Sequence, residues 1–401
     1  MKLNRITKTI GSITLAAALV FGTVGVVPAQ TDIAKAATTP IDATSLAAML
    51  EQVKTATLGV IATQKTKEIT SITIDNPLNP DAEPMSASAV GLTDPVGKIM
   101  SFSITNGEKK SNAYADLGKK LVYMYNDELK RYEVRESAGF STESMTKAFD
   151  PAIFTSLGDA VSAVLGEAKQ IGSTMCKNIE LNIKADQAKI KELAPQFSAL
   201  FGSAGSLFGG SINVSGFDLS TANIDISQLI TGIDFKLNTY IDDLNVLKGA
   251  DIDGTINVNV GSLFGNLGTT DIPPIAAKIV SSSTCEVTDE TAEIPADVVK
   301  KAELAAGVNA TASGLEFVST VRDNKNTVFT LTAVKNKKAK KITIPATIKK
   351  LGKSYKVLYA DSFVFKKCKN LKTLVVKNKS LRKLLKDGRS NYGIKKKVKI
   401  K

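Results

Sequence analysis

The first hydrophobic pattern of helical period lies between residues 44 and 53. Four apolar residues stand at positions i, i+3, i+4 and i+7, which places them on one face of a helix. These residues are Leu46, Met49, Leu50 and Val53. Asp42 or Thr44 precedes them and is suited to cap the N-terminus. The pattern predicts one amphipathic helix over this segment.

Short runs with strand-like composition follow this helix. Turn-forming pairs such as Asn76-Pro77, Asp94-Pro95 and Asn106-Gly107 separate them. Because successive runs are joined by short turns, they predict an antiparallel meander. The predicted strands are 56–63, 69–75, 86–92, 97–105, 111–116, 120–126 and 131–135.

Two more helices and four more strands are predicted before residue 302. Asp150-Pro151 offers an N-cap and an N1 proline. The apolar stripe of the helix that they start is Phe154, Leu157, Val161, Val164 and Leu165. The next helix is predicted from Ala185 to Gln196, and the strands are 179–184, 234–241, 254–260 and 277–288.

The predicted strand 120–126 is apolar on both of its faces, so one face can meet helices while the other lines a cavity. Alternation then gives a set of cavity candidates, each of which also fits an ordinary core position. The candidates are Phe102, Leu121, Tyr123, Tyr125, Phe154, Leu157 and Val161. Two glycine-rich segments, 197–217 and 261–270, share the sequence Gly-Ser-Leu-Phe-Gly and are predicted loops that pack on the core or gate a ligand.

Charge is distributed unevenly over the 401 residues, whose net charge is +13. Residues 38–314 contain 22 basic and 34 acidic side chains, whereas residues 315–401 contain 26 basic and 4 acidic ones. Residues 304–314 (LAAGVNATASG) have the composition of a linker between these modules. The chain has no His, which excludes a Ser-His-Asp triad, a Cys-His pair and a His-ligated metal.

Residues 1–37 have the layout of a secretory signal peptide. Lys2, Arg5 and Lys8 precede an apolar run over 13–27, and the small-residue site Ala34-Lys35-Ala36 follows it. This order is typical of a cleaved export signal, and the run is short for the ~20 residues that cross a membrane. We expect a secreted protein with a first domain over 38–303.

The order of predicted elements over about 40–302 resembles the half-barrel proteins related to LolA and LppX. A helix leads, strands follow, helices cross, strands return, and the sequence IPADVVKKA closes the unit at 294–302. The resemblance implies an α+β fold, a curved antiparallel half-barrel sheet with helices on its concave face. It also implies a cavity for a hydrophobic or lipid-like ligand. The sequence departs from that family in lacking a lipobox Cys and in the glycine-rich insertion at 197–217.

The basic module over 315–401 contains a repeat-like run, FKKCKNLKTLVVKN. Its apolar spacing is typical of a solenoid coil that buries side chains against the next coil. The inward residues are Phe365, Cys368, Leu371, Leu374 and Val376. Together with 340–357, the run resembles BspA-like leucine-rich repeats of bacterial surface proteins over about 326–401. The resemblance implies a short, β-rich leucine-rich-repeat-like module with one full recognisable repeat.

The three cysteines allow different interpretations. Cys368 occupies the position at which the BspA-like repeat buries a Cys, which favours a structural thiol. Cys176 and Cys285 are candidates for a disulfide, because secretion permits disulfides and both lie beside strands of the same module. The alternative is that both thiols are free.

The lysines of the basic module come in pairs and triplets that create a field attractive to polyanions. The candidate polyanion-binding residues are Lys337, Lys338, Lys340, Lys341, Lys366, Lys367, Lys395, Lys396 and Lys397. The expected partner is an anionic cell-wall polymer or membrane surface, and the alternative is a solvated face. Nucleic acid is not expected, since aromatic residues are not interleaved with the lysine runs.

These observations predict a monomeric, non-enzymatic binding protein of a Gram-positive bacterium, with no cofactor. Its half-barrel would bind a hydrophobic or lipid-like ligand, and its cationic module would hold it loosely at the cell wall. The alternative is a structural or adhesive surface protein whose repeat module binds wall polymer or a host partner. A hydrolase would require two carboxylates facing each other in the cavity.

Overall fold

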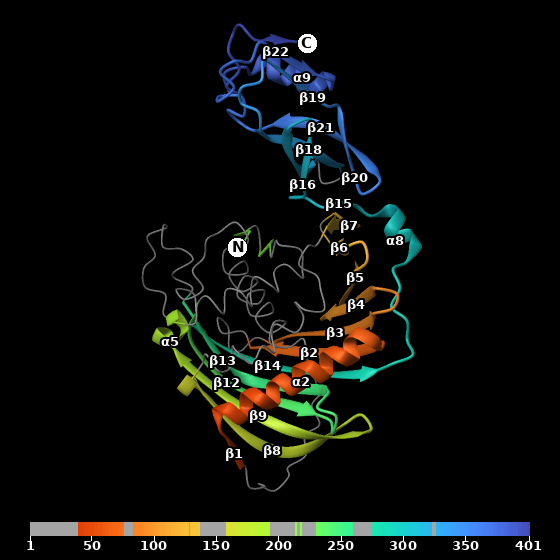
Figure 1. Ribbon diagram of the computed structural model, residues 1–401, viewed down its shortest axis with the longest axis vertical. Helices are drawn as coiled ribbons and strands as arrows, with labels where there is room; N and C mark the ends of the chain where they lie inside the picture. Colours follow the sequence, from red (N-terminus) through yellow and green to blue (C-terminus); the bar gives the residue numbers. More distant parts are fainter. Residues whose placement is uncertain are drawn as a thin grey trace. The chain divides into compact units, whose positions relative to one another are not determined.

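The computed structural model describes residues 39–75, 83–127, 129–136, 158–192, 230–259, 275–322 and 326–401, and the backbone of two short strands within 213–218. The chain divides into two compact units, one of residues 1–122 and 137–294, the other of 123–136 and 295–401. The fold is α+β and rich in strands (Figure 1). No helix in the described ranges has the length and apolar character needed to cross a membrane.

The first unit is built on a large curved antiparallel sheet (Figure 1). Its strands are ordered β1-β8-β9-β12-β13-β14-β2-β3-β4-β5. A further strand, β6 (Leu121–Asn126), begins in this unit and ends in the second. The bounds are β1 Thr39–Ile41, β2 Thr66–Ile74, β3 Met85–Asp94, β4 Ile99–Asn106, β5 Lys109–Asp116, β8 Val161–Ile171, β9 Thr174–Asp186, β12 Ile230–Ile241, β13 Leu247–Val258 and β14 Ile275–Val287.

The first helix, α2 (Ala43–Thr63), lies across one face of this sheet (Figure 1). The side chain of Asp42, one of the two caps that the sequence predicted, accepts a hydrogen bond from the Ser45 N–H at 3.0 Å. The helix continues through 56–63, so the strand predicted there is wrong. Its buried stripe extends to Thr57, whose Oγ1 accepts a hydrogen bond from the Leu247 N–H at 3.0 Å. Packing on the sheet therefore overrides the local strand preference of this segment.

The helix predicted after Pro151 is also wrong where the structure describes it. Phe154 and Leu157 lie outside the described residues, a single turn of 3-10 helix, η2, covers Gly158–Ala160, and Val161 begins strand β8. Gly172, with φ of 56°, and Ser173 form the two-residue turn that joins β8 to β9. Helix α5 (Gln187–Glu192) is a short part of the helix predicted over 185–196, of which residues 193–196 are not described.

The two faces of the sheet differ because side chains alternate along each strand. The face under α2 is apolar and buries residues from six strands. Its largest buried members include Ile179, Leu181, Phe235, Leu237, Ile252 and Ile279. The opposite face carries cross-strand ion pairs, such as Lys236 Nζ to Glu180 Oε2 at 2.7 Å and Lys169 Nζ to Asp251 Oδ2 at 2.9 Å. One-sided burial of this kind fixes the register of the strands.

The second unit combines a hairpin with two small sheets. The end of β6, with β7 (Arg131–Glu136), supplies the hairpin, and β15 (Glu303–Leu304) pairs in parallel with β7. A five-stranded sheet has the order β16-β17-β18-β21-β20, and a three-stranded parallel sheet the order β19-β22-β23. Helices α8 (Ala296–Lys301) and α9 (Lys379–Asp387) complete it. The strands are β16 Asn309–Ala312, β17 Leu315–Arg322, β18 Asn326–Val334, β19 Lys341–Ile344, β20 Thr347–Lys350, β21 Lys353–Ala360, β22 Thr373–Val376 and β23 Lys399–Ile400.

The predicted linker at 304–314 is an ordered part of the second unit. Leu304 and Ala305 are buried, and β16 pairs with β17 in antiparallel register. The alanine- and glycine-rich composition that suggested a linker instead suits a closely packed strand and its turn at Ser313-Gly314.

Candidate polyanion-binding surface

Three short parallel strands organise the end of the second unit. Lys341 of β19, Thr373 of β22 and Lys399 of β23 are aligned in one row of the sheet. The inward positions of these strands are buried and belong to one hydrophobic cluster. They are Ile342, Ile344, Leu374, Val376 and Ile400. Adjacent strands lie ~4.8 Å apart, so Lys341 and Lys399 stand on the outer face about two strand spacings from each other.

The segments between these strands are also fixed by named contacts. Asn378 caps α9 by accepting a hydrogen bond from the Leu381 N–H at 3.2 Å, and Leu381 and Leu385 are buried. The guanidinium of Arg389 donates to the carbonyl oxygens of Lys396 at 3.2 Å and Val398 at 2.9 Å. Arg389 therefore shapes the loop that presents Lys395, Lys396 and Lys397 to solvent.

The nine lysines predicted to bind polyanions are all exposed. Between Ser354 and Lys401, all of which the structure describes, the sequence contains 16 basic and 2 acidic residues. No ion pair joins any of these basic side chains to a carboxylate within the described residues. Three lysines that precede this segment do have partners, for example Lys350 Nζ with Glu136 Oε2 at 2.6 Å. The end of the unit is thus a surface of uncompensated positive charge.

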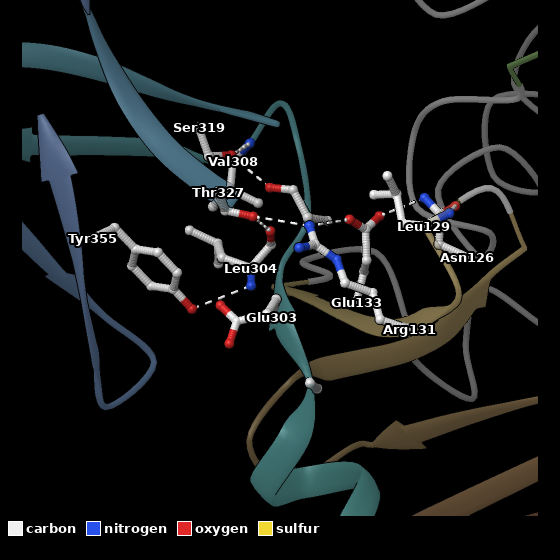
Figure 2. Close-up of polar contacts among 12 residues, drawn as sticks. Asn126, Leu129, Arg131, Glu133, Glu303, Leu304, Val308, Ser319, Thr327 and Tyr355 are labelled. Carbon is white, nitrogen blue, oxygen red and sulfur yellow. Dashed lines mark hydrogen bonds and ion pairs between the residues drawn. The ribbon is translucent and has the colours of Figure 1, made fainter. Parts of the chain in front are cut away.

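A buried polar network ties the hairpin to the rest of the second unit, as Figure 2 shows. Arg131 donates to Glu133 Oε1 at 2.9 Å and to Thr327 Oγ1 at 3.1 Å. The Thr327 hydroxyl donates to the carbonyl of Leu304 at 2.8 Å, and the Leu304 N–H donates to the Tyr355 hydroxyl at 3.2 Å. Residues 123–136 therefore belong to the same folded body as the basic segment.

The structure describes five of the seven residues predicted to line a cavity, and they lie on β4, β6 and β8. Phe102, Leu121 and Val161 belong to the first unit, whereas Tyr123 and Tyr125 belong to the second. Leu121 and Tyr123 are buried, and the Tyr125 ring packs edge-on against Tyr132 with centroids 5.2 Å apart. Val161 and Phe102 lie on strands that are seven positions apart in the sheet order. Phe102 is half-buried, with its ring over Gly91 of the neighbouring strand.

The disulfide considered for Cys176 and Cys285 does not form. All three cysteines are free thiols. Strands β12 and β13 separate the strands that carry these two residues, a spacing of about 14 Å at ~4.8 Å per strand. A disulfide requires Cα atoms within ~7 Å. Cys368 is buried in the hydrophobic cluster of the second unit, as the sequence predicted for this thiol.

The sequence analysis missed a carboxyl–thiol pair on the face under α2. Glu68 of β2 and Cys285 of β14 are direct cross-strand partners. Burial raises the pKa of Glu68 to about 8 and that of the Cys285 thiol to about 12. The signal was available, because Glu68 occupies an inward position of the alternating series that continues through Thr70, Ile72 and Ile74. Within the described residues no group of three Cys, Asp or Glu side chains could hold a metal ion.

A scan against protein-family models found no match, and a search of curated proteins found no significant match.

Proposed function

We propose that this chain is a non-enzymatic bacterial surface protein whose second unit holds it on an anionic polymer of the cell envelope. The observation that carries the proposal is the segment from Ser354 to Lys401, with 16 basic and 2 acidic residues and no ion pair to a carboxylate in the described part of the chain. Unpaired like charges repel one another and destabilise a compact fold. A polyanion that neutralises them would remove this cost and gain counterion release.

The resemblance to BspA-like surface repeats supports this proposal, as do the three parallel strands stacked in register. The predicted signal peptide would bring the protein to the envelope. A solvated, charge-stabilised surface would have the same composition, so the test must measure binding and its dependence on salt.

The test compares two triple variants that remove equal charge from different units. The first is K395Q/K396Q/K397Q, and the second, the control, is K98Q/K109Q/K110Q, whose lysines are exposed in the first unit. Both are assayed as full chains on purified walls of a Gram-positive bacterium over a salt series. We expect the first variant alone to bind more weakly, with a log–log salt slope smaller by about 1 for each lysine that no longer pairs with an anionic group of the polymer. Equal weakening in both variants would show a net-charge effect and contradict a site in the second unit.

Substitution is preferable to deletion of 326–401. Deletion would remove Thr327 and Tyr355 and leave Arg131 and Leu304 without these polar partners. Loss of binding after deletion would then report unfolding. Binding that persists at high salt and depends on one protein partner would favour the adhesive alternative.

A second candidate function is the binding of a hydrophobic, lipid-like ligand by the first unit. It is favoured by Phe102 and Ile104, which are half-buried on the same face of the sheet as α2 but outside the cluster beneath that helix. The resemblance to LolA- and LppX-like half-barrels points the same way. Native mass spectrometry before and after organic extraction tests it, and a protein of unchanged mass in both states would contradict it.

A further inference from the structure

Phe363 differs from every other aromatic residue in the described part of the chain by its exposure. Its side chain is 57% exposed, whereas the other described Phe and Tyr residues are buried or half-buried. Leaving a phenyl ring in water forgoes the burial of a large apolar surface. Isolated apolar side chains are common on surfaces, so exposure alone does not identify a site.

The backbone of Phe363 adds a second, independent observation. Its φ of 58° lies in the left-handed region, which costs energy for a residue with a bulky side chain. The other described non-glycine residues with positive φ are lysines, an asparagine, a serine and one leucine. A bulky ring in this conformation, without burial in return, is typical of a position kept for binding.

The ring is presented from a firmly held loop. The Phe363 N–H donates to the carbonyl of Asn391 at 2.7 Å, and its own carbonyl accepts from the Lys366 N–H at 2.8 Å. Gly393 approaches so closely that a Cβ there would lie 2.7 Å from the Lys366 nitrogen. The loop before β22 is thus packed directly on the loop before β23. A platform that is already ordered loses little entropy when a ligand binds.

The surroundings of the ring are cationic and polar. Lys366 Nζ lies 5.5 Å from the ring centroid and has no carboxylate partner within the described residues. Ser362 and Asn391 are exposed next to Phe363, in sequence and through its backbone hydrogen bond. Their side chains offer donors and acceptors of the kind that hydroxyl groups use.

We propose that Phe363 and Lys366 bind one sugar ring of an acidic polysaccharide. The weakly positive C–H face of a pyranose would stack on the negative face of the phenyl ring, and its carboxylate would meet the Lys366 ammonium. This proposal rests on the polyanion-binding function proposed above and narrows it to a polymer whose charges are carried on sugar rings. Single-stranded nucleic acid stacks successive bases on several aromatic side chains, whereas the described surface offers one.

The test uses Phe363→Asn in the full chain, because Asn tolerates the left-handed conformation and removes the ring. The probes are polygalacturonate, which has acidic sugar rings, and linear polyphosphate, which has none. We expect binding of polygalacturonate to weaken about tenfold, a change of the size that one stacked ring provides, and binding of polyphosphate to stay within about twofold. The thermal midpoint should not fall, because the strain of Phe363 is relieved.

Leu384→Ala is the matched control, since Leu384 is the other exposed large apolar residue of the same segment, at 37%. It should alter neither affinity. Unchanged polygalacturonate binding by Phe363→Asn, or an equal decrease for both polymers, would overturn the sugar-ring proposal. Both proteins are also titrated with a single-stranded oligonucleotide, and a decrease confined to that probe would overturn the sugar-ring proposal. Binding of the unmodified protein to each polymer is measured before any variant is compared. If it binds neither polymer, the proposed polyanion-binding function itself is contradicted.

Discussion

Replacing Glu68 by Gln should stabilise the first unit at neutral and alkaline pH. Glu68 faces Cys285 on the sheet face under α2, and its carboxylate accepts a hydrogen bond from Thr70 Oγ1 at 3.3 Å. Burial raises its pKa from 4.5 to about 8. The folded carboxyl thus holds its proton more tightly than the unfolded one. The cost of its charge is absent below pH 4.5, grows as the pH rises, and is complete above about pH 8.

The size of this effect follows from the same pKa difference. At ~1.4 kcal/mol per pH unit, the charge costs at most about 3 kcal/mol at pH 7 and about 5 kcal/mol above pH 8. Glu68 is only half-buried, so residual water should reduce these limits. We expect Glu68→Gln to raise the free energy of unfolding of the first unit by roughly 1–3 kcal/mol at pH 8 and by much less at pH 5.

The chain has no Trp whose fluorescence could report unfolding. The free thiols instead allow the unfolding of each unit to be measured separately. Cys176 and Cys285 report on the first unit, and Cys368 reports on the second. Pulsed alkylation along a guanidinium titration, analysed by peptide mass spectrometry, gives one transition for each unit. Each pulse is normalised to the unfolded chain at the same pH. An identical pH dependence of the Cys176 transition in both proteins would refute the argument, and the Cys368 transition should not change.

Four further substitutions test the packing of the two units, two in each. Gly254→Ala should destabilise the first unit by about 2 kcal/mol or more, because a Cβ there would lie 2.3 Å from the carbonyl oxygen of Asp234. Gly59→Ala, in open space on α2, should stabilise the same unit by about 0.5–1 kcal/mol. The Cys176 transition measures both changes. Thr327→Val should cost the second unit about 1–3 kcal/mol, since it removes the hydrogen bond to Leu304 in a buried network. Leu374→Ala, at a fully buried position of β22, should cost about 2–5 kcal/mol, and the Cys368 transition measures these last two changes.

Strands that carry clear alternation and end in turn pairs could be predicted from the sequence. The predicted runs 69–75, 86–92 and 111–116 coincide closely with β2, β3 and β5. Local chemistry determines such elements, because the period of the pattern and the turn residues lie within a few positions of each other. The cap at Asp42 could be predicted for the same reason.

The elements that could not be predicted depend on distant partners. The end of α2 has strand-like residues, yet its Thr57 stripe packs on β13 and keeps the segment helical. Strand β8 contains residues at helical spacing, yet it pairs with β1 and β9. A stronger local signal was present in the second case, because Gly172-Ser173 is a typical hairpin turn and predicts strands on both sides.

The same distinction applies to the candidate site. Its charge lies in consecutive residues, so the sequence alone placed the exposed lysines. The contacts that hold the unit together do not lie in consecutive residues, because Arg131, which pairs with Glu133, donates to Thr327 across 196 positions of the chain. Thr327 in turn donates to the carbonyl of Leu304. The exposed ring of Phe363 likewise depends on its backbone contact with Asn391. The cationic segment is therefore recognisable in isolation, but it belongs to one folded unit with residues 123–136. Its binding must be tested by substitutions within the intact chain.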